Sequence, residues 1–357
     1  MLSHIAATTF LLLALARPRV LPAQARDTLR LTFVGDVNFA RSLHRVYLNE
    51  GRGAEVFARV KDRLRAADVA VVNLESLLLD RGRTADTTNS PVFAGPVEAL
   101  PLLVDAGFDV VGTANNHAWD FGQAGLMENL IHLGNAGVAF TGTGPSAEAA
   151  WRPAVVRARG WTVAVFGLTY IINHPTLTVR NTPAQCCIAW ADTLDAARRF
   201  RYARDSLSAD LVIAFVHQGR VEYRAHPDRE TVSLFRGLVR AGADAVIGHH
   251  PHVPQGVEWI AGRPIVYSLG NFVFRQPQPW THRGLVAELT WTPSGGPPRL
   301  DLVPVAAGYV PAWLTGPDSA AVMAHVDSIS RRIGLPQAPR RRTIARPVPP
   351  SRTRGSP

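Results

Sequence analysis

Seven side chains that could bind metal ions or carry protons recur at one kind of position in this 357-residue sequence. Each follows a short apolar run, at the point where the run ends: Asp36, Glu75, Asn116, His117, His217, His250 and His252. Carboxylate, amide oxygen and imidazole are ligands for divalent ions such as Zn, Mn or Fe. No thiolate is among them, which argues against a structural zinc site. The set predicts a metal centre, and cleavage of phosphoester or of amide bonds fits it equally.

Taken singly, these motifs differ in strength. An Asp after a strand is commonly a helix N-cap, and Asn115-Asn116-His117 alone could be a turn. The segment Gly248 to His252 is stronger, because it sets His250 and His252 two residues apart on an extended stretch. His249 would then point the other way, and we interpret it as a residue that supports the ligands.

The apolar runs have the length and composition of buried strands. They cover residues 29–34, 68–72, 109–112, 162–168, 211–216, 245–247 and 264–269, and residues 285–291 close the series. Apolar residues at helical spacing lie between them, at 53–67, 96–106, 125–136, 193–208 and 229–241. Alternation of strand and helix predicts an α/β fold with its ligands outside the carboxyl ends of the strands. Less helix between the later runs predicts a second sheet facing the first, within one domain.

The two ends of the chain differ from its body. Residues 1–25 combine an apolar run with the small-x-small pattern Ala23-Gln24-Ala25, which predicts an exported protein with a signal peptide. A retained N-terminal membrane anchor is the alternative. Residues 316–335 are expected to form a C-terminal helix. Residues 336–357 are rich in Arg and Pro, which predicts a disordered tail.

The formal net charge of +10 is concentrated in that tail, where six arginines face no acidic residue. We therefore expect no nucleic-acid partner, and peripheral contact of the tail with anionic lipid or polymer stays open. Cys186 and Cys187 are the only cysteines. Because neighbouring cysteines bridge only through a strained small ring, we assign them no role.

Six sequence blocks resemble the signature blocks of the CapA family, the poly-γ-glutamate capsule biosynthesis proteins, which are themselves similar to calcineurin-like metallophosphoesterases. In chain order they are Gly35 to Asn38, Asn73 to Glu75, Ala114 to Gly122, His217 to Tyr223, Gly248 to Gln255 and Tyr267 to Phe272. The blocks keep the order of the family, and the resemblance covers residues 28–315.

The resemblance implies a four-layer α/β/β/α sandwich of the metallophosphoesterase type that binds two divalent metal ions (Mn, Zn or Fe). The first ion would be held by Asp36 and His252. The second would be held by Asn116, His217 and His250, and Glu75 would bridge the two ions. The catalytic pair would be His117, as general acid, and Asp120, which orients its imidazole. Residues that support the ligands or meet substrate would be Asn38, Asn73, Arg220, Glu222, Tyr223, His249 and Asn271.

At two positions this sequence differs from the patterns of the related families, and both differences affect which properties the resemblance implies. Metallophosphoesterases usually have a His where this chain has Asn38, and an amide is a weaker ligand, so we expect the first ion to bind less tightly. Gln218 stands where the family commonly has Trp, which leaves the substrate open.

The sequence thus predicts an exported, metal-dependent hydrolase-like protein of poly-γ-glutamate or related envelope-polymer biosynthesis. Its substrate would be an anionic polymer or a phosphoester, and its partners would be capsule-synthesis membrane proteins. Two alternatives remain: a general envelope phosphatase or phosphodiesterase, and a non-catalytic accessory protein that binds or exports the polymer.

Overall fold

The computed structural model describes residues 26–83, 92–173 and 187–333. The expected signal segment, Cys186 and the Arg/Pro-rich tail lie outside these ranges. Among the helices within them, none has the length and hydropathy needed to span a bilayer.

The first sheet holds eight strands in the order β16-β15-β14-β1-β2-β5-β6, with β13 also beside β1. They are β1 (Leu29–Val37), β2 (Val69–Leu74), β5 (Val110–Gly112), β6 (Ala139–Thr141), β13 (Asn271–Val273), β14 (Arg283–Trp291), β15 (Arg299–Ala306) and β16 (Ala312–Trp313). β1, β2, β5 and β6 run parallel, so their carboxyl ends lie at one edge. β14 and β15 continue the sheet in antiparallel pairing.

The second sheet holds six strands in the order β11-β12-β10-β9-β8-β7. They are β7 (Ala154–Ala158), β8 (Trp161–Thr169), β9 (Leu211–His217), β10 (Ala245–His249), β11 (Val257–Ile260) and β12 (Arg263–Val266). The four central strands are parallel, whereas the edge strands β7 and β11 are antiparallel to their neighbours. A separate pair, β3 (Leu77–Leu79) and β4 (Ala94–Pro96), completes the strands of the described chain.

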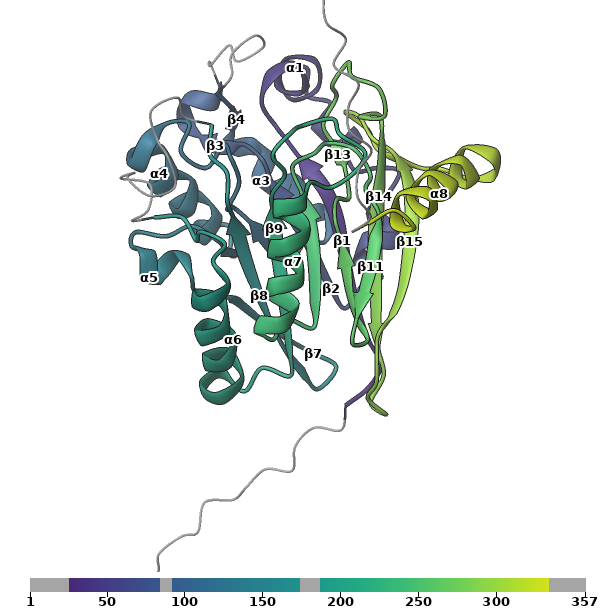
Figure 1. Ribbon diagram of the computed structural model, residues 1–357. Coiled ribbons are helices and arrows are strands. Elements are labelled where there is room, and N and C mark those ends of the chain that lie inside the picture. Colours follow the sequence, from purple (N-terminus) through teal and green to yellow (C-terminus); the bar gives the residue numbers. More distant parts are fainter. Residues whose placement is uncertain (1–25, 84–91, 174–186, 334–357) are drawn as a thin grey trace, which may run out of the picture.

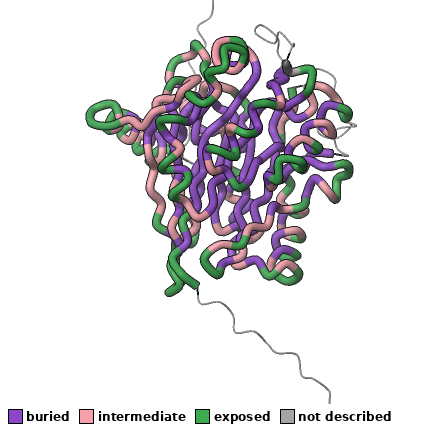
Figure 2. Tube along the Cα trace, turned by 180° about the vertical axis from the view of Figure 1, so that it is seen from behind, coloured by how far each residue is buried: buried purple, intermediate pink, exposed green. Residues whose placement is uncertain are grey.

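The two sheets pack face to face, and helices cover both outer faces (Figure 1). Phe33 of β1 meets Phe215 of β9 in the core between the sheets, with ring centroids 6.2 Å apart. α2 (Lys61–Arg65), α3 (Leu100–Ala106) and α4 (Gly122–Asn135) share a buried cluster with the first sheet. α6 (Thr193–Leu207) and α7 (Arg229–Ala241) share one with the second. The fold is therefore the expected four-layer α/β/β/α sandwich, with its buried segments in the middle of the molecule (Figure 2).

Helix limits follow local chemistry. The Asp228 carboxylate accepts a hydrogen bond from the Thr231 N–H and caps α7, which ends at Gly242 with φ of 118°. The remaining helical elements are short or lie at the end of the described chain: α1 (Arg41–Leu43), η1 (His44–Leu48), η2 (Gly53–Glu55), η3 (Asp80–Arg83), η4 (Val97–Ala99), α5 (Ala147–Ala150) and α8 (Gly316–Ser330).

Two expectations need correction. The strand series does not close at residue 291, because β15 pairs with β14 along its whole length; Pro304 within β15 hid it, since proline is unusual inside a strand. The helix expected over 53–67 breaks into η2 and α2, because the chain between them turns to bury Val56 and Phe57. Cys187, to which we assign no role, is buried, and its carbonyl oxygen accepts a hydrogen bond from Gly144 N.

Candidate metal centre

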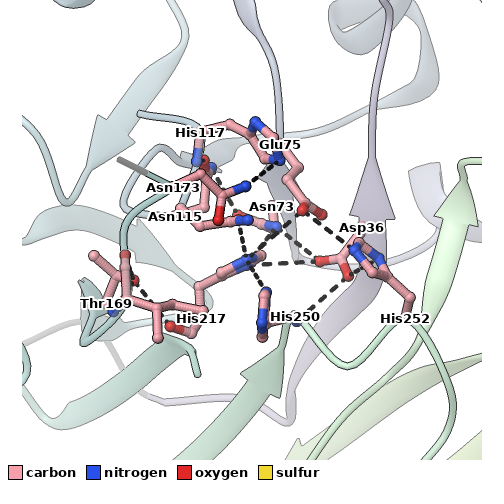
Figure 3. A network of polar contacts seen from close by, with 12 residues as sticks. Asp36, Asn73, Glu75, Asn115, His117, Thr169, Asn173, His217, His250 and His252 are labelled. Atoms are coloured by element: carbon pink, nitrogen blue, oxygen red, sulfur yellow. Dashed lines mark hydrogen bonds and ion pairs between the residues drawn. The ribbon is translucent and has the colours of Figure 1, made fainter. Parts of the chain in front are cut away.

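The predicted ligands come from both sheets and meet at one edge of the sandwich (Figure 3). β1, β2 and β5 lead into the three ligands of the first sheet, and β9 and β10 lead into the three of the second. Their side chains are Asp36, Glu75, Asn116, His217, His250 and His252, each at most 5% exposed. The parallel strand directions explain the convergence, since carboxyl ends of parallel strands share an edge.

Two glycines allow the strands to approach this closely. A Cβ on Gly35 would lie 2.1 Å from the carbonyl oxygen of Gly270, and one on Gly248 would lie 2.1 Å from that of Tyr267. Asp36 N then donates a hydrogen bond to Gly270 O over 3.0 Å. The glycines of the first and fifth sequence blocks are thus required by backbone contact.

Asp36, Glu75 and His252 form the first group of ligand atoms. His252 Nδ1 lies 3.3 Å from Asp36 Oδ2, and His252 Nε2 lies 3.5 Å from Glu75 Oε1. Asn271 Oδ1 lies 2.9 Å from His252 Nδ1. Asn271 therefore fixes the ring so that Nε2 faces Glu75.

His217, His250 and Glu75 form the second group. His217 Nε2 lies 2.8 Å from Asn116 Oδ1, 3.2 Å from His250 Nδ1 and 3.8 Å from Glu75 Oε1. In each of the two groups the ligand atoms all lie within 4.8 Å of one another. Glu75 belongs to both groups, which is the arrangement that a bridging carboxylate requires.

The electrostatics of the cluster suit cations. Neither carboxylate oxygen of Glu75 has a hydrogen-bond partner among the described residues. Burial, reinforced by the charge of Asp36, raises the pKa of Glu75 well above its usual value. A buried carboxylate of this kind is costly to ionise without a positive partner. Divalent ions would supply that partner, so the residues present fit the expected metals.

Two imidazoles of the centre, those of His217 and His250, are held in the neutral form that binds metal. Burial lowers the pKa of His217 well below its usual value, and burial together with His252 lowers the pKa of His250 to about 3. Burial alone would raise the pKa of Asp36, but the hydrogen bond from His252 and nearby imidazole charge hold it below its usual value. Asp36 is accordingly the ionised member of the carboxylate pair.

His117 and Asp120 lie beside the cluster rather than within it. His117 Nδ1 lies 2.7 Å from Asp120 Oδ2, and the His117 ring stacks on Phe93 with centroids 3.8 Å apart. The other ring nitrogen, Nε2, lies 3.1 Å from the Asn173 amide. The ring is thus held on one edge and one face, as the expected orienting role of Asp120 requires.

The expected supporting residues differ in what they contact. The Asn73 amide donates to Asp36 Oδ1 over 2.7 Å and lies 3.1 Å from His217 Nδ1, so it joins the two sheets. His249 Nε2 lies 3.0 Å from the carbonyl oxygen of Val34, away from the ligand groups. Asn38 Oδ1 accepts a hydrogen bond from Ala40 N over 2.8 Å, so its oxygen stabilises the turn after β1.

The three residues after His217 separate in space. Glu222 forms a third group of ligand atoms with His250 and His252, and the Tyr223 ring stacks on His252 with centroids 5.8 Å apart. Arg220 is exposed, and its guanidinium lies 3.7 Å from the Glu230 carboxylate at the surface. Glu222 and Tyr223 therefore face the centre, whereas Arg220 is directed to solvent.

Sequence reasoning missed Arg41. Its guanidinium stacks over Phe93, 4.3 Å from the ring centroid, on the residue that also stacks on His117. Burial lowers the pKa of Arg41, while electrostatic interaction with the acidic side chains of Tyr223 and Glu75 acts in the opposite direction. The sequence does show a basic residue shortly after the first block. The direction of the Arg41 side chain, however, depends on a left-handed backbone at this residue, with φ of 59°.

A four-layer α/β/β/α sandwich with Asp, Glu, Asn and His side chains gathered at the carboxyl edge has the architecture of the metallophosphoesterase type. The family model described as "Bacterial capsule synthesis protein PGA_cap" matches residues 30–276. The chain therefore belongs to this capsule synthesis family, the one that its sequence blocks resemble.

Relatives of known name agree with this assignment. The chain is 32% identical to the PGA biosynthesis protein CapA of Bacillus subtilis (strain 168), over 71% of this chain and 65% of the relative. It is 30% identical to the capsule biosynthesis protein CapA of Bacillus anthracis, over 73% of this chain and 64% of the relative. The chain thus spans slightly less than two thirds of the length of either relative.

Two solved structures show distant likeness. A hypothetical protein from Thermus thermophilus is 19% identical, with a TM-score of 0.45 and coverage of 81% of this chain and 100% of that chain. A putative 5'-nucleotidase from Staphylococcus aureus is 12% identical, with a TM-score of 0.46 and coverage of 84% and 58%. The fold class assigned to this chain rests on its own sheets and layers.

Proposed function

We propose that this chain is an exported, metal-dependent hydrolase-like protein that acts in the synthesis of poly-γ-glutamate or a related anionic envelope polymer. Family membership supports the role in capsule synthesis. The observation that carries the catalytic part is Glu75, a buried carboxylate without hydrogen bonds in the described chain that belongs to two ligand groups at once. Export is inferred from residues 1–25, and capsule-synthesis membrane proteins are the expected partners.

The residues divide the work of hydrolysis. Asp36 and His252 would hold one divalent ion, Asn116, His217 and His250 the other, and Glu75 both. Such ions, when bound, act as Lewis acids and lower the pKa of water at the site. His117, held by Asp120, would hold the proton for the leaving group at Nε2, a role worth about a hundred- to ten-thousandfold in rate.

The side chains around this centre favour an anionic substrate. Arg41 places a guanidinium over Phe93, the ring on which His117 also stacks, and a carboxylate or phosphate of the substrate would pair with it. The depth of the ligands, each at most 5% exposed, limits water at the reacting groups. Both properties suit cleavage of a charged chain, and they hold for amide and phosphoester bonds alike.

The test combines metal content with chain length of the polymer. Purified protein should contain bound Mn, Zn or Fe by elemental analysis, and it should shorten poly-γ-glutamate as followed by size-exclusion chromatography. Asp36→Ala and His217→Ala should lose both properties, whereas His325→Ala, on α8 and in none of the ligand groups, should keep them. Purified protein without bound metal, or with metal but equal activity in all four forms, contradicts the proposal.

The same assay separates the alternatives. A general envelope phosphatase would turn over nitrophenyl phosphomonoesters or diesters in the presence of Mn²⁺ and leave the polymer intact. A non-catalytic accessory protein would cleave neither, and His117→Ala would leave capsule formation in cells unchanged.

A further inference from the structure

A cavity of 960 Å³ lies next to the metal centre but does not include its ligands. Its walls come from η1, from the stretch containing η2, from the turn after β13, and from the segment that follows β15. The residues that give it chemical character are Tyr47, Arg52, Arg59, Arg275, Gln276 and Tyr309.

Two tyrosines form an aromatic wall of the cavity, and the faces of both rings are covered by other side chains. The Tyr47 and Tyr309 rings pack together with centroids 5.7 Å apart. Arg52 lies over Tyr47 at 4.5 Å, and Arg275 lies over Tyr309 at 5.7 Å. Because a planar guanidinium group stacked in this way keeps its N–H edge available, Arg275 presents hydrogen-bond donors to the cavity.

The cavity carries uncompensated positive charge. Glu55 is its only acidic residue, and Arg52 binds both oxygens of that carboxylate over 2.9 and 2.8 Å. Arg59 and Arg275 form no ion pair with any residue in the described ranges. Two guanidinium groups are therefore available to an anionic ligand.

One residue joins this cavity to the metal centre. Gln276 Oε1 accepts a hydrogen bond from Asn271 Nδ2 over 2.9 Å, and Gln276 Nε2 donates to the Tyr223 hydroxyl over 3.1 Å. Asn271 in turn lies 2.9 Å from His252, and Tyr223 stacks on the same imidazole. The wall of the cavity and the position of a metal ligand are thus set by one short network.

We propose that this cavity is a second binding subsite, which holds a carboxylate-rich stretch of the polymer whose neighbouring part lies at the metal centre. The assignment rests on the proposed function for the identity of the chain. Carboxylates of the ligand would pair with Arg59 and Arg275, and its methylene groups would pack beside the tyrosines. A nucleic acid is disfavoured, since its bases need open aromatic faces and these rings are covered by arginines and by each other.

The experiment measures binding separately from cleavage. A fluorescently labelled γ-linked glutamate oligomer is titrated with the full chain, and its anisotropy gives Kd with and without added Mn²⁺. The Arg59→Gln, Arg275→Gln double variant should bind at least about tenfold more weakly, because two charge-assisted contacts are lost. The double variant Arg157→Gln, Arg331→Gln removes the same charge from exposed positions elsewhere, and its Kd should stay within about twofold of the parent's.

Each outcome bears on one claim. If the cavity variant and the control weaken binding equally, or if the parent does not bind the oligomer, the subsite assignment is overturned. An oligonucleotide of equal charge that binds more tightly through the same arginines also overturns it. If binding depends on Arg59 and Arg275 but no form of the protein cleaves polymer, the subsite stands and the hydrolase proposal fails. Thermal unfolding of each variant shows that the fold is retained, as expected for exposed side chains.

Discussion

His117 Nδ1 lies 2.7 Å from Oδ2 of Asp120, and this carboxylate oxygen also accepts a hydrogen bond from Phe93 N over 2.7 Å. The Asp120 carboxylate is therefore held by a backbone N–H as well as by the imidazole. Because the Phe93 ring also stacks on His117, the orientation of the imidazole depends on both contacts.

Asp120→Asn should lower kcat of the proposed hydrolysis by about ten- to a hundredfold, the range for loss of a group that orients an active-site imidazole. KM should change little, because Asp120 would not contact substrate. Steady-state kinetics on the polymer would measure both constants. Elemental analysis provides the control, since metal content should equal that of the parent. A parallel loss of metal would show that Asp120 supports the ligands instead.

Arg41→Gln should raise KM for an anionic substrate by about tenfold, because a charge-assisted contact is lost. We expect kcat to change less, since the guanidinium is placed to pair with substrate charge. Arg45→Gln, which alters an exposed arginine of η1, is the matched control. An unchanged KM in Arg41→Gln would show that this arginine serves only to pack against Phe93.

Gly35→Ala should destabilise the fold by about 3 kcal/mol or more, because the new Cβ meets the backbone of a neighbouring segment. That Cβ would lie 2.1 Å from Gly270 O. Gly134→Ala is the control: nothing lies within 4 Å of its Cβ position in α4, so the change should be neutral or stabilising by up to about 1 kcal/mol. Urea unfolding of both variants checks the difference, and equal stabilities would contradict the close approach of β1 and β13.

Metal-free protein should lose stability as the pH falls below 6.5. The pKa of His250 is lowered from 6.5 to about 3 by burial, so between these values the unfolded chain binds a proton that the folded chain excludes. Unfolding free energy therefore rises with pH across this window, by at most about 1.4 kcal/mol per pH unit for one histidine. Glu75 acts with the opposite sign above its usual pKa, because its folded-state pKa is raised.

The slope in His250→Ala isolates this contribution. Urea unfolding of EDTA-treated parent and variant between pH 4.5 and 7 gives the dependence of stability on pH, and the variant should have the shallower rise. Comparing slopes removes the constant cost of the cavity that the substitution creates. Identical slopes would mean that His250 gains its proton as easily in the folded chain as in the unfolded one.

Much of the fold and of the ligand set could be predicted from local pattern. The observed α7 has the predicted limits, Arg229 and Ala241, because an Asp cap and a following Gly mark its ends. β9 ends at His217, itself an expected ligand, and β10 ends at His249, next to the expected ligand His250. Strand ends and helix caps depend on neighbours in sequence, so single-sequence reasoning can reach them.

Relations between distant segments required the tertiary structure. β15 contains Pro304 and became a strand only because β14 lies beside it. The Arg41 side chain lies over Phe93 because the backbone at Arg41 is left-handed. This conformation cannot be predicted from the residue type, since arginine rarely adopts it. The cavity beside the centre joins Tyr47 to Tyr309, residues that are far apart in the chain.

The metal centre shows both contributions. The sequence alone determined which residue types end the strands, and with them the chemistry of carboxylate, amide and imidazole ligands. That Glu75 belongs to both ligand groups was decided by the packing of the two sheets, which brings His217 of one sheet within 3.8 Å of a carboxylate carried by the other. The physical reason is that residue type is a local property, whereas the distance between two side chains depends on every contact that holds the layers together.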